Sequence, residues 1–300
     1  MPRGRYLTLV LLLQAALPSR LIGQEHVDVG RAARPDLALR IFALSGSLRI
    51  TTWANDSVHV RGRVDRGAGR FFLGGTREAL KLGIETPQGA EPDGAADLEI
   101  RIPARSRLWV KTAAAEVEIT AGGGSVEVFG ESGRVRVDGQ AESVNVETID
   151  GNVELALVSA SGRVRTASGT IVVRGVVRDL EAATISGPLL VGMEGAVARV
   201  SLETVASEIA FKGDIEPEGR LHAETHGGDV ELRLPARLGA SYRLVSFGGQ
   251  LINELVPPSA VRPGPHKGEW TFTTGDGRAT VEVRTFKGRI ALKVRGEPAH

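Results

Sequence analysis

The 300-residue sequence contains no cysteine, which excludes disulfide bonds, thiolate metal sites, cysteine catalysis and a lipid-modified bacterial N-terminus. Aromatic residues make up only 4% of the chain, so a core would have to be built mainly from aliphatic side chains. An excess of either charge is also missing, because 37 Lys and Arg stand against 36 Asp and Glu. With no basic block and no aromatic residues interleaved among basic ones, a nucleic-acid-binding role is not expected.

Long hydrophobic runs are absent after the N-terminus. Arg3 and Arg5 precede an apolar stretch over residues 7–17, and the small residue Gly23 stands where a signal peptidase would cut. We therefore expect a signal peptide over residues 1–23 and an exported protein that is periplasmic, on the cell surface or secreted. The alternative is an uncleaved anchor, although the apolar run is shorter than the ~20 residues that a spanning helix needs.

Glycine, in contrast, is abundant, with 38 residues, and it recurs at fixed intervals. The corners Thr148-Ile-Asp-Gly151, Thr166-Ala-Ser-Gly169 and Thr184-Ile-Ser-Gly187 follow one another every 18 residues, with short alternating segments between them. A period near 20 residues with alternating β-formers is typical of a stacked repeat fold. The sequence therefore predicts an all-β fold, a single-stranded parallel β-solenoid (β-helix-like) of about ten short turns.

The repeat can be indexed by its corner residues, whose spacings are 18, 18, 18, 18, 20, 21, 21 and 39: Ala115, Gly133, Gly151, Gly169, Gly187, Ser207, Gly228, Gly249 and Gly288. Two residues after each corner the side chain is always aliphatic: Val117, Val135, Val153, Ile171, Leu189, Ile209, Val230, Leu251 and Ile290. Because alternate residues of a strand share one face, these positions are expected to stack into continuous columns inside one core.

The corner residues suggest a folding device. Glycine tolerates positive φ where a chain turns sharply, so we expect that conformation at the corners. Most corners also carry a threonine three residues before the glycine. Its hydroxyl is expected to face inward at the strand end and to bond a neighbouring backbone group.

The domain organisation follows from the same pattern. Residues 24–36 are polar and are interpreted as a linker, and residues 37–295 as one β-solenoid domain. Two segments interrupt the repeat, a loop or hairpin insertion at 65–96 and a Pro-rich loop at 256–268. A hairpin-like turn at the C-terminus is expected to cap the open end of the coil, where unpaired backbone invites aggregation.

One surface feature suggests an interaction site. The third residue after the corner becomes apolar at Val172, Leu190 and Ala210, on a face where other repeats carry charged residues. An uncovered apolar patch of this kind can mark an interface. The alternative is that residues 65–96 or another loop cover it, and the sequence leaves both open.

The sequence offers no convincing chemical site. His222, Glu224 and His226 alternate on one strand and have the residue types of a zinc site, but a solvated polar strand face explains them more simply. Asp residues such as Asp150 and Asp276 fall in turns, where Asp is common. We therefore expect no enzyme activity and nominate no catalytic, cofactor-binding or metal-binding residue and no cofactor.

Several motifs resemble the DUF4097 family of bacterial adhesin-like domains of unknown function. They are Ser45-Gly-Ser-Leu48, Ile100-Arg-Ile-Pro103, the serial Thr-x-Ser-Gly corners, Leu232-Arg-Leu-Pro235 and Thr285-Phe-Lys-Gly-Arg-Ile290. The resemblance spans about residues 37–295. It implies a role at the cell envelope or surface, with some relatives associated with envelope-stress signalling, and it brings no catalytic residues.

Our leading hypothesis is an exported, non-catalytic β-solenoid that presents an extended surface for adhesion or binding at the bacterial cell envelope, with an envelope protein or a glycan as partner. The first alternative is a sensory or regulatory module of an envelope-stress response. The second is a polysaccharide-cleaving β-helix enzyme, which would need an acidic cluster or a cation site in a long groove. Fold class alone does not decide among them.

Overall fold

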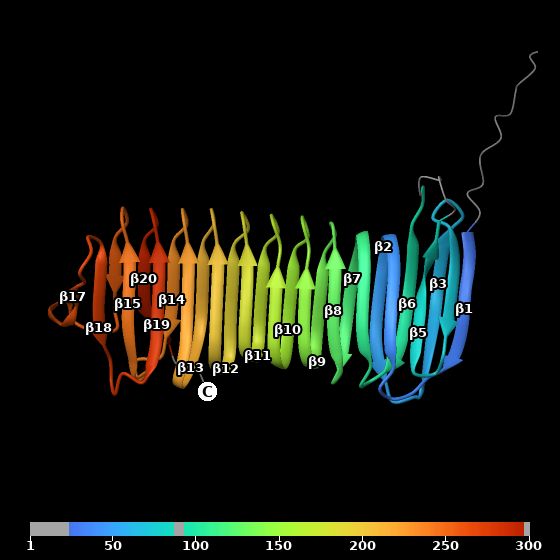
Figure 1. The fold of residues 1–300 in the computed structure, drawn as a ribbon, viewed down its shortest axis with the longest axis horizontal. Coiled ribbons are helices and arrows are strands. Elements are labelled where there is room, and N and C mark those ends of the chain that lie inside the picture. Colours follow the sequence, from blue (N-terminus) through green and yellow to red (C-terminus); the bar gives the residue numbers. More distant parts are fainter. Residues whose placement is uncertain (1–23, 87–92, 297–300) are drawn as a thin grey trace, which may run out of the picture.

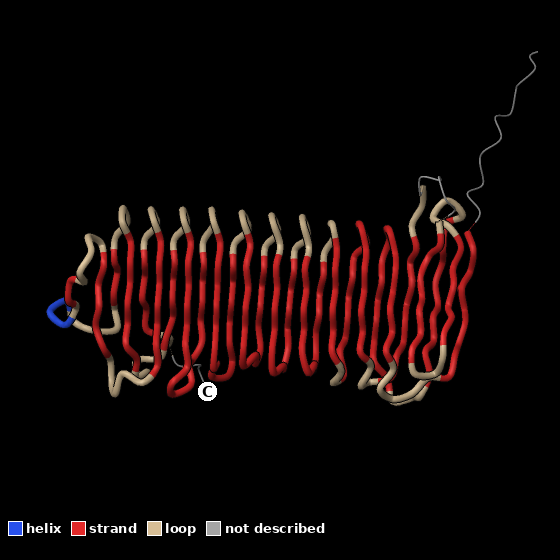
Figure 2. The backbone as a smooth tube through the Cα atoms, in the orientation of Figure 1, coloured by secondary structure: helices blue, strands red, loops and turns tan. Residues whose placement is uncertain are grey.

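The computed structural model describes residues 24–86 and 93–296; the predicted signal peptide at 1–23 and part of the predicted 65–96 insertion lie outside them. The described chain is all-β, with twenty strands hydrogen-bonded into one long, mostly parallel sheet (Figures 1 and 2). The single short 3-10 helix of this part is η1 (Pro258–Ala260). Within the same residues, no helix has the length and apolar character needed to cross a membrane.

Five long strands form the middle of the elongated molecule: β9 (Val135–Glu147), β10 (Val153–Arg165), β11 (Ile171–Thr184), β12 (Leu189–Thr204) and β13 (Ile209–Thr225). Each pairs in parallel with the next, and Val135, Val153 and Ile171 are neighbours in register. Each long strand turns at one edge of the stack and returns on the opposite face (Figure 2). We call a corner together with the strand segments on either side of it a rung.

The aliphatic columns lie in one shared core, as predicted. Val135, Val153 and Ile171 are 1%, 0% and 0% exposed and belong to a single cluster that runs from Val27 to Leu292. The core holds few rings, and its largest fully buried side chain is Phe211. Because each rung packs mainly on the rungs beside it, the stack grows in one direction, which gives the molecule its length (Figure 1).

The corner threonines connect successive rungs, as expected. The Thr225 hydroxyl accepts a hydrogen bond from the Gly228 amide (3.1 Å) and donates one to the carbonyl of Ser207 in the preceding rung (3.1 Å). Thr285 does the same with the Gly288 amide (3.0 Å) and the Gly228 carbonyl (3.1 Å). One buried hydroxyl thus satisfies two backbone groups that the turn would leave unpaired.

The predicted reason for the corner glycines is wrong for most of them. Of the corner glycines that the structure describes, Gly133 has a positive φ (98°), whereas the others have no left-handed conformation. A Cβ atom on Gly169 or Gly187 would instead collide with the carbonyl oxygen of the preceding corner, Gly151 or Gly169 respectively. The close approach of stacked corners therefore selects glycine there.

The N-terminal end departs from a simple coil. Its strands are β1 (Gln24–Ala32), β2 (Ala38–Trp53), β3 (Ser57–Asp65), β6 (Ala96–Pro103), β7 (Arg107–Gly122) and β8 (Ser125–Gly130). Strand β2 lies between β7 and β6, parallel to both, while β3 is antiparallel to β6 and β1 is antiparallel to β3. Strand β8 pairs in parallel with β7 and β9 and continues the stack.

The predicted linker at 24–36 is wrong, because most of it is strand β1. All nine residues of β1 pair with β3, and Val27 is buried. Most residues of β1 are polar and exposed, as in a linker, because a strand at the end of a stack needs few buried side chains. The insertion at 65–96 does contain a hairpin, β4 (Arg70–Gly75) and β5 (Ala79–Glu85), but β5 also pairs with β2 and so belongs to the main sheet.

At the C-terminal end the chain does not wind in order. The strands are β14 (Val230–Leu234), β15 (Ala240–Ser246), β16 (Leu251–Asn253), β17 (Arg262–Pro263), β18 (Glu269–Thr273), β19 (Ala279–Thr285) and β20 (Ile290–Val294). Strand β19 lies between β13 and β15, and β20 lies between β14 and β16. The last rung is therefore inserted between two earlier ones (Figure 1).

The cap that we predicted at the C-terminal turn is accordingly wrong. Strand β18 lies antiparallel on β15, and β17 lies on β18. Val256 and Val261 from the Pro-rich segment and Trp270 from β18 pack against the core. This segment supplies the side chains that cover the end. Strands β19 and β20 are instead flanked by strands on both sides, and Val281, Val283, Ile290 and Leu292 are completely buried.

Candidate functional site

Val172, Leu190 and Ala210, the predicted interaction surface, lie side by side on β11, β12 and β13. The register pairs Val172 with Leu190 and Leu190 with Ala210. Each is half-buried, and together they form the floor of a hollow of about 290 Å³. The β4–β5 hairpin pairs with β2, far along the stack, so it does not cover them. We call these three residues the apolar strip.

Basic residues stand beside the apolar strip, two positions farther along β11 and β13, with a glycine at the equivalent position of β12. The register places Gly192 beside Arg174 on β11 and beside Lys212 on β13. A Cβ atom on Gly192 would meet no atom within 4 Å, so the space above it is open. The two cations therefore stand two strand spacings apart, about 10 Å, across a gap.

Neither cation is neutralised by a neighbour, since Arg174 and Lys212 make no ion pair within the described residues. The adjoining carboxylate, Glu231, instead pairs with Lys293 (2.6 Å) and Arg233 (2.7 Å). The hydrogen bond from Lys293, with that from Arg233, holds the pKa of Glu231 below its usual range. The local charge beside the strip is therefore positive.

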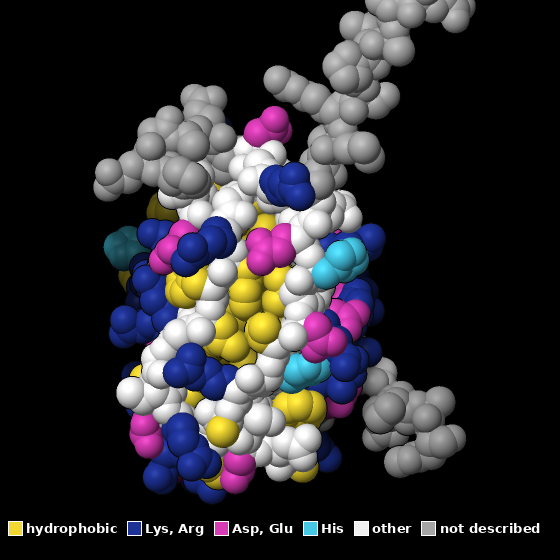
Figure 3. Space-filling view, turned by 90° about the vertical axis from the view of Figure 1, so that its right-hand side faces the viewer, with side chains coloured by type: hydrophobic (Ala, Val, Ile, Leu, Met, Phe, Trp, Pro, Cys, Tyr) yellow, Lys and Arg dark blue, Asp and Glu magenta, His cyan; other side chains and the backbone are white. Residues whose placement is uncertain are grey.

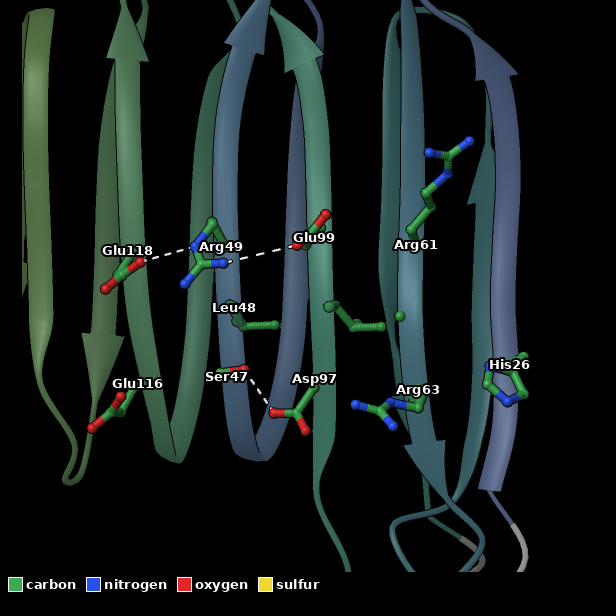
Figure 4. Close-up of a pocket in the computed structure, with 12 residues that line it drawn as sticks. His26, Ser47, Leu48, Arg49, Arg61, Arg63, Asp97, Glu99, Glu116 and Glu118 are labelled. Atoms are coloured by element: carbon green, nitrogen blue, oxygen red, sulfur yellow. Dashed lines mark hydrogen bonds and ion pairs between the residues drawn. The ribbon is translucent and has the colours of Figure 1, made fainter.

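A second hollow, of about 640 Å³, lies on the sheet near the N-terminal end and is lined mainly by charged residues (Figure 4). Arg49 on β2 lies between Glu118 on β7 (3.0 Å) and Glu99 on β6 (3.8 Å). Beside them the Ser47 hydroxyl donates to the Asp97 carboxylate (2.6 Å). We call this hollow the charged groove.

The charged groove is basic toward β1 and acidic toward β7. Arg61 on its basic side pairs with Asp28 (3.3 Å), and Arg63 and His26 lie beside it (Figure 4). Because several of these charges already have partners, a ligand would have to displace existing ion pairs. Exposed pairs of this kind contribute only ~0.2–1 kcal/mol each, and they chiefly fix which strands lie next to one another.

Of the three residues that resembled a zinc site, the structure brings His222 and Glu224 together and places His226 apart. His222 faces Glu224 (3.3 Å) and Glu282 (3.8 Å), whereas His226 lies in the corner and stacks on Phe286, with ring centroids 5.0 Å apart. No group of three or more metal-ligating side chains occurs in the described part of the chain.

One exposed apolar surface was not predicted from the sequence. The residue after the corner Thr or Ser is apolar in many rungs and points outward, and the large ones are 46–57% exposed: Ile149, Ile185, Val205, Phe247 and Phe286. Backbone hydrogen bonds link these corners in series, with Ala167 between Ile149 and Ile185 and His226 between Val205 and Phe286, so they form a ridge along one edge of the stack. The signal was visible in the sequence as an apolar residue inside a polar turn.

Comparisons with solved structures show similarity to a protein of Parabacteroides distasonis named a "putative lipid binding protein", with 11% identity, a TM-score of 0.52, and coverage of 90% of this chain and 97% of that one. A "putative adhesin" of the same species has 12% identity and a TM-score of 0.43, covering 90% and 97%. Another, of Bacteroides fragilis, has 9% identity and a TM-score of 0.42, covering 90% and 98%.

At 11% identity the first of these similarities concerns the fold alone, and the other two, with TM-scores below 0.5, carry no argument. No family model matches the sequence, and no curated protein matches it. The resemblance to the DUF4097 family therefore stays a prediction.

Proposed function

We propose that this protein is an exported, non-catalytic β-solenoid that binds an anionic amphiphile of the bacterial cell envelope on the face formed by β11, β12 and β13. Parallel, in-register rungs around one core support the assignment to β-solenoids. Rigid rungs hold outward side chains in rows, so one face can present a fixed pattern of charge and apolar surface.

The observation that carries the proposal is the pairing of the apolar strip with two free cations. Arg174 and Lys212 flank the open space at Gly192, and the half-buried strip of Val172, Leu190 and Ala210 lies directly beside it. A phosphate or carboxylate head group can take hydrogen bonds from both cations. The adjoining hydrocarbon then covers apolar surface at about 25 cal/mol per Å².

The acidic residues support a non-catalytic role. A general acid at neutral pH needs a raised pKa, but Glu181 on the opposite face has its pKa lowered by a hydrogen bond from Arg165, together with the Arg163 pair (3.0 Å). The pKa of Glu231 is lowered in the same way, by hydrogen bonds from Lys293 and Arg233. Both carboxylates therefore act as ion-pair partners, and neither is suited to be the general acid of polysaccharide cleavage.

Two further observations favour the envelope. The predicted signal peptide at 1–23 would export the chain. The solved structure that resembles the fold with a TM-score of 0.52 carries the name "putative lipid binding protein". The proposal for this chain nevertheless depends on its own residues, since the two sequences share 11% identity.

The test is flotation of the purified protein with phospholipid vesicles, either wholly zwitterionic or containing an anionic phospholipid. We expect binding to the anionic vesicles and a loss of at least about tenfold in affinity when Arg174→Gln and Lys212→Gln are combined, equivalent to ~1.4 kcal/mol. Leu190→Asp should weaken binding similarly, because it places a carboxylate on the apolar strip.

The matched control combines Arg105→Gln with Lys111→Gln, which removes the same charge from two exposed residues outside the site. This control should bind within twofold of the unmodified protein. An equal loss of affinity in both double variants would mean that vesicle binding depends on the total positive charge and not on this site, which would contradict the proposal. Failure of the unmodified protein to bind anionic vesicles would also contradict it.

A further inference from the structure

The N-terminal end of the stack exposes its core. Seen end-on, hydrophobic side chains gather between two layers of backbone, with charged residues around them (Figure 3). Val29, on the terminal strand β1, is 38% exposed although its neighbour in β3, Val60, is completely buried. Phe71 and Leu73, on β4, are only partly buried against the core.

Two edge strands frame this open core. Within the described residues β1 pairs with β3 alone and β4 with β5 alone, so each strand has a side without a partner strand. The Arg31 guanidinium of β1 donates to the carbonyl oxygens of Leu73 (3.3 Å) and Gly75 (2.8 Å) in β4. These bonds hold the two edges together across the end.

The opposite end of the molecule is built differently. There β18 and the Pro-rich segment lie over the terminal rung, and Leu255, Val256, Val261 and Trp270 pack against its core. In residues 24–86 and 93–296 the N-terminal end has no such cover. Open edges of this kind promote association with further strands.

We propose that the N-terminal end is the interface of a head-to-head homodimer, in which β1 pairs with β1 and β4 with β4 of the second copy. A two-fold axis perpendicular to the two sheet layers reverses strand direction, so one operation makes both pairs antiparallel. This continues the antiparallel order of β1 and β3 across the interface, and it joins the two cores into one.

The sequence of β1 suits pairing with itself. With Asp28 at the two-fold axis, Val27 lies opposite Val29 of the second copy, and Glu25 lies opposite its Arg31. Val27, Val29, Glu25 and Arg31 all lie on the core side of the strand, because their partners in β3 include the buried Val58, Val60 and Val64. Glu25 and Arg31 make no ion pair within the described residues, and Arg31, whose hydrogen bonds go to the carbonyl oxygens of Leu73 and Gly75, keeps a positive charge that can attract Glu25 of the other copy.

The two Asp28 side chains would meet at the axis, and like charges opposite one another are unfavourable. Each Asp28 carboxylate is, however, already paired with His59 (2.8 Å) and Arg61 (3.3 Å) of its own chain. The hydrogen bond from His59, with the Arg61 pair, lowers the pKa of Asp28. The positive charge of Arg61 and the hydrogen bond with His59 offset the repulsion across the axis.

Sedimentation velocity and small-angle X-ray scattering of the purified protein test the dimer. We expect a dimer whose maximum dimension is nearly twice that of the monomer, because the rods join at their ends. Val29→Asp should give a folded monomer, judged by an unchanged circular dichroism spectrum. Val294→Asp, the matched control at a residue 42% exposed elsewhere in the chain, should remain dimeric.

The absence of cysteine allows a direct test of the register. Directly opposed residues of antiparallel strands lie about 4.5–5.5 Å apart between Cα atoms, within disulfide range. Asp28→Cys should therefore crosslink two chains under oxidation, whereas Ser259→Cys, in the short helix η1, should not. A monomer at all concentrations, a dimer no longer than one rod, a dimer unaffected by Val29→Asp, or crosslinking only through Ser259→Cys would each overturn the proposal.

Discussion

At the scale of single residues, the corners show that glycine is required by the contact between rungs. The carbonyl of one corner occupies the space that a Cβ of the next would fill, as at Gly187 over Gly169. The threonine of the corner supplies the complementary attraction through its two hydrogen bonds. One position in each rung is therefore limited by space and another by hydrogen bonding, and substitutions can separate the two effects.

Gly187→Ala should lower the free energy of unfolding by about 2–3 kcal/mol, because the new methyl group collides with backbone that cannot move alone. Gly192→Ala is the matched control, since its methyl group enters open space and reduces the entropy of the unfolded chain. It should be neutral or stabilising by about 0.5 kcal/mol. Chemical denaturation checks both, and equal effects would contradict the packing explanation.

Thr285→Val should cost about 1–3 kcal/mol, because it keeps the side-chain shape and removes the partner of the Gly288 amide and the Gly228 carbonyl. Thr204 occupies the equivalent position in another rung, but its buried hydroxyl has no hydrogen-bond partner in the structure. Thr204→Val should therefore be neutral or stabilising. A thermal shift assay compares the melting temperatures of the two variants with that of the unmodified protein. Similar decreases in both variants would show that the two hydrogen bonds of the Thr285 hydroxyl contribute nothing to stability.

At the scale of elements, the sequence predicted the interior of the stack better than its ends. Aliphatic columns and corners reveal a rung wherever it lies, because each rung meets the same packing requirement. They do not reveal rung order, since Val230, Leu251 and Ile290 are chemically equivalent occupants of one column. The insertion of β19 and β20 between earlier rungs was therefore not predictable from periodicity.

The candidate site was predictable only in part. Alternation in the sequence indicated the apolar strip, because Val172, Leu190 and Ala210 replace polar residues at equivalent positions. The flanking cations were not recognised, since the gap between Arg174 and Lys212 depends on the register that brings Gly192 between them. Strand β1 was missed because only one side of an end strand packs on the core.

The C-terminal cap depends on one buried carboxylate. The Glu269 side chain is 2% exposed, accepts a hydrogen bond from Arg243 (2.9 Å), and also accepts one from the His266 amide. Glu269→Ala should lower the unfolding free energy by about 2 kcal/mol and loosen the Pro-rich segment over the end. In this variant, amide hydrogen exchange should become faster at residues 264–273 than in the unmodified protein, whereas exchange in the central strands should stay the same. Unchanged protection there would argue against this anchor.

At the scale of the whole molecule, ion pairs along the faces make stability depend on pH. Glu181 and Glu231 have folded-state pKa values below 4.5, so their contribution is complete above the unfolded pKa and is lost as the pH falls through the folded one. Burial raises the pKa of Tyr242 from 10.0 to about 12, so the unfolded state gains by ionising first as the pH rises above 10.

The melting temperature should consequently stay level between about pH 5 and 9, fall below about pH 4.5 and fall again above about pH 10. Because the two carboxylates are about one third exposed, the acid effect should be modest for each pair. Differential scanning calorimetry across this range checks the profile. A melting temperature that rises on acidification would contradict the assigned ion pairs.

The fold depends on a single core in which the last rung lies between two earlier ones, and disulfide trapping tests this arrangement most directly. Thr280 is the neighbour of both Arg220 and Ser241, which do not neighbour each other. With neighbouring strands about 4.8 Å apart, Arg220→Cys with Thr280→Cys should form an intramolecular disulfide, measured by mass spectrometry. Arg220→Cys with Ser241→Cys should stay reduced; a disulfide in this second pair and none in the first would contradict the structure described.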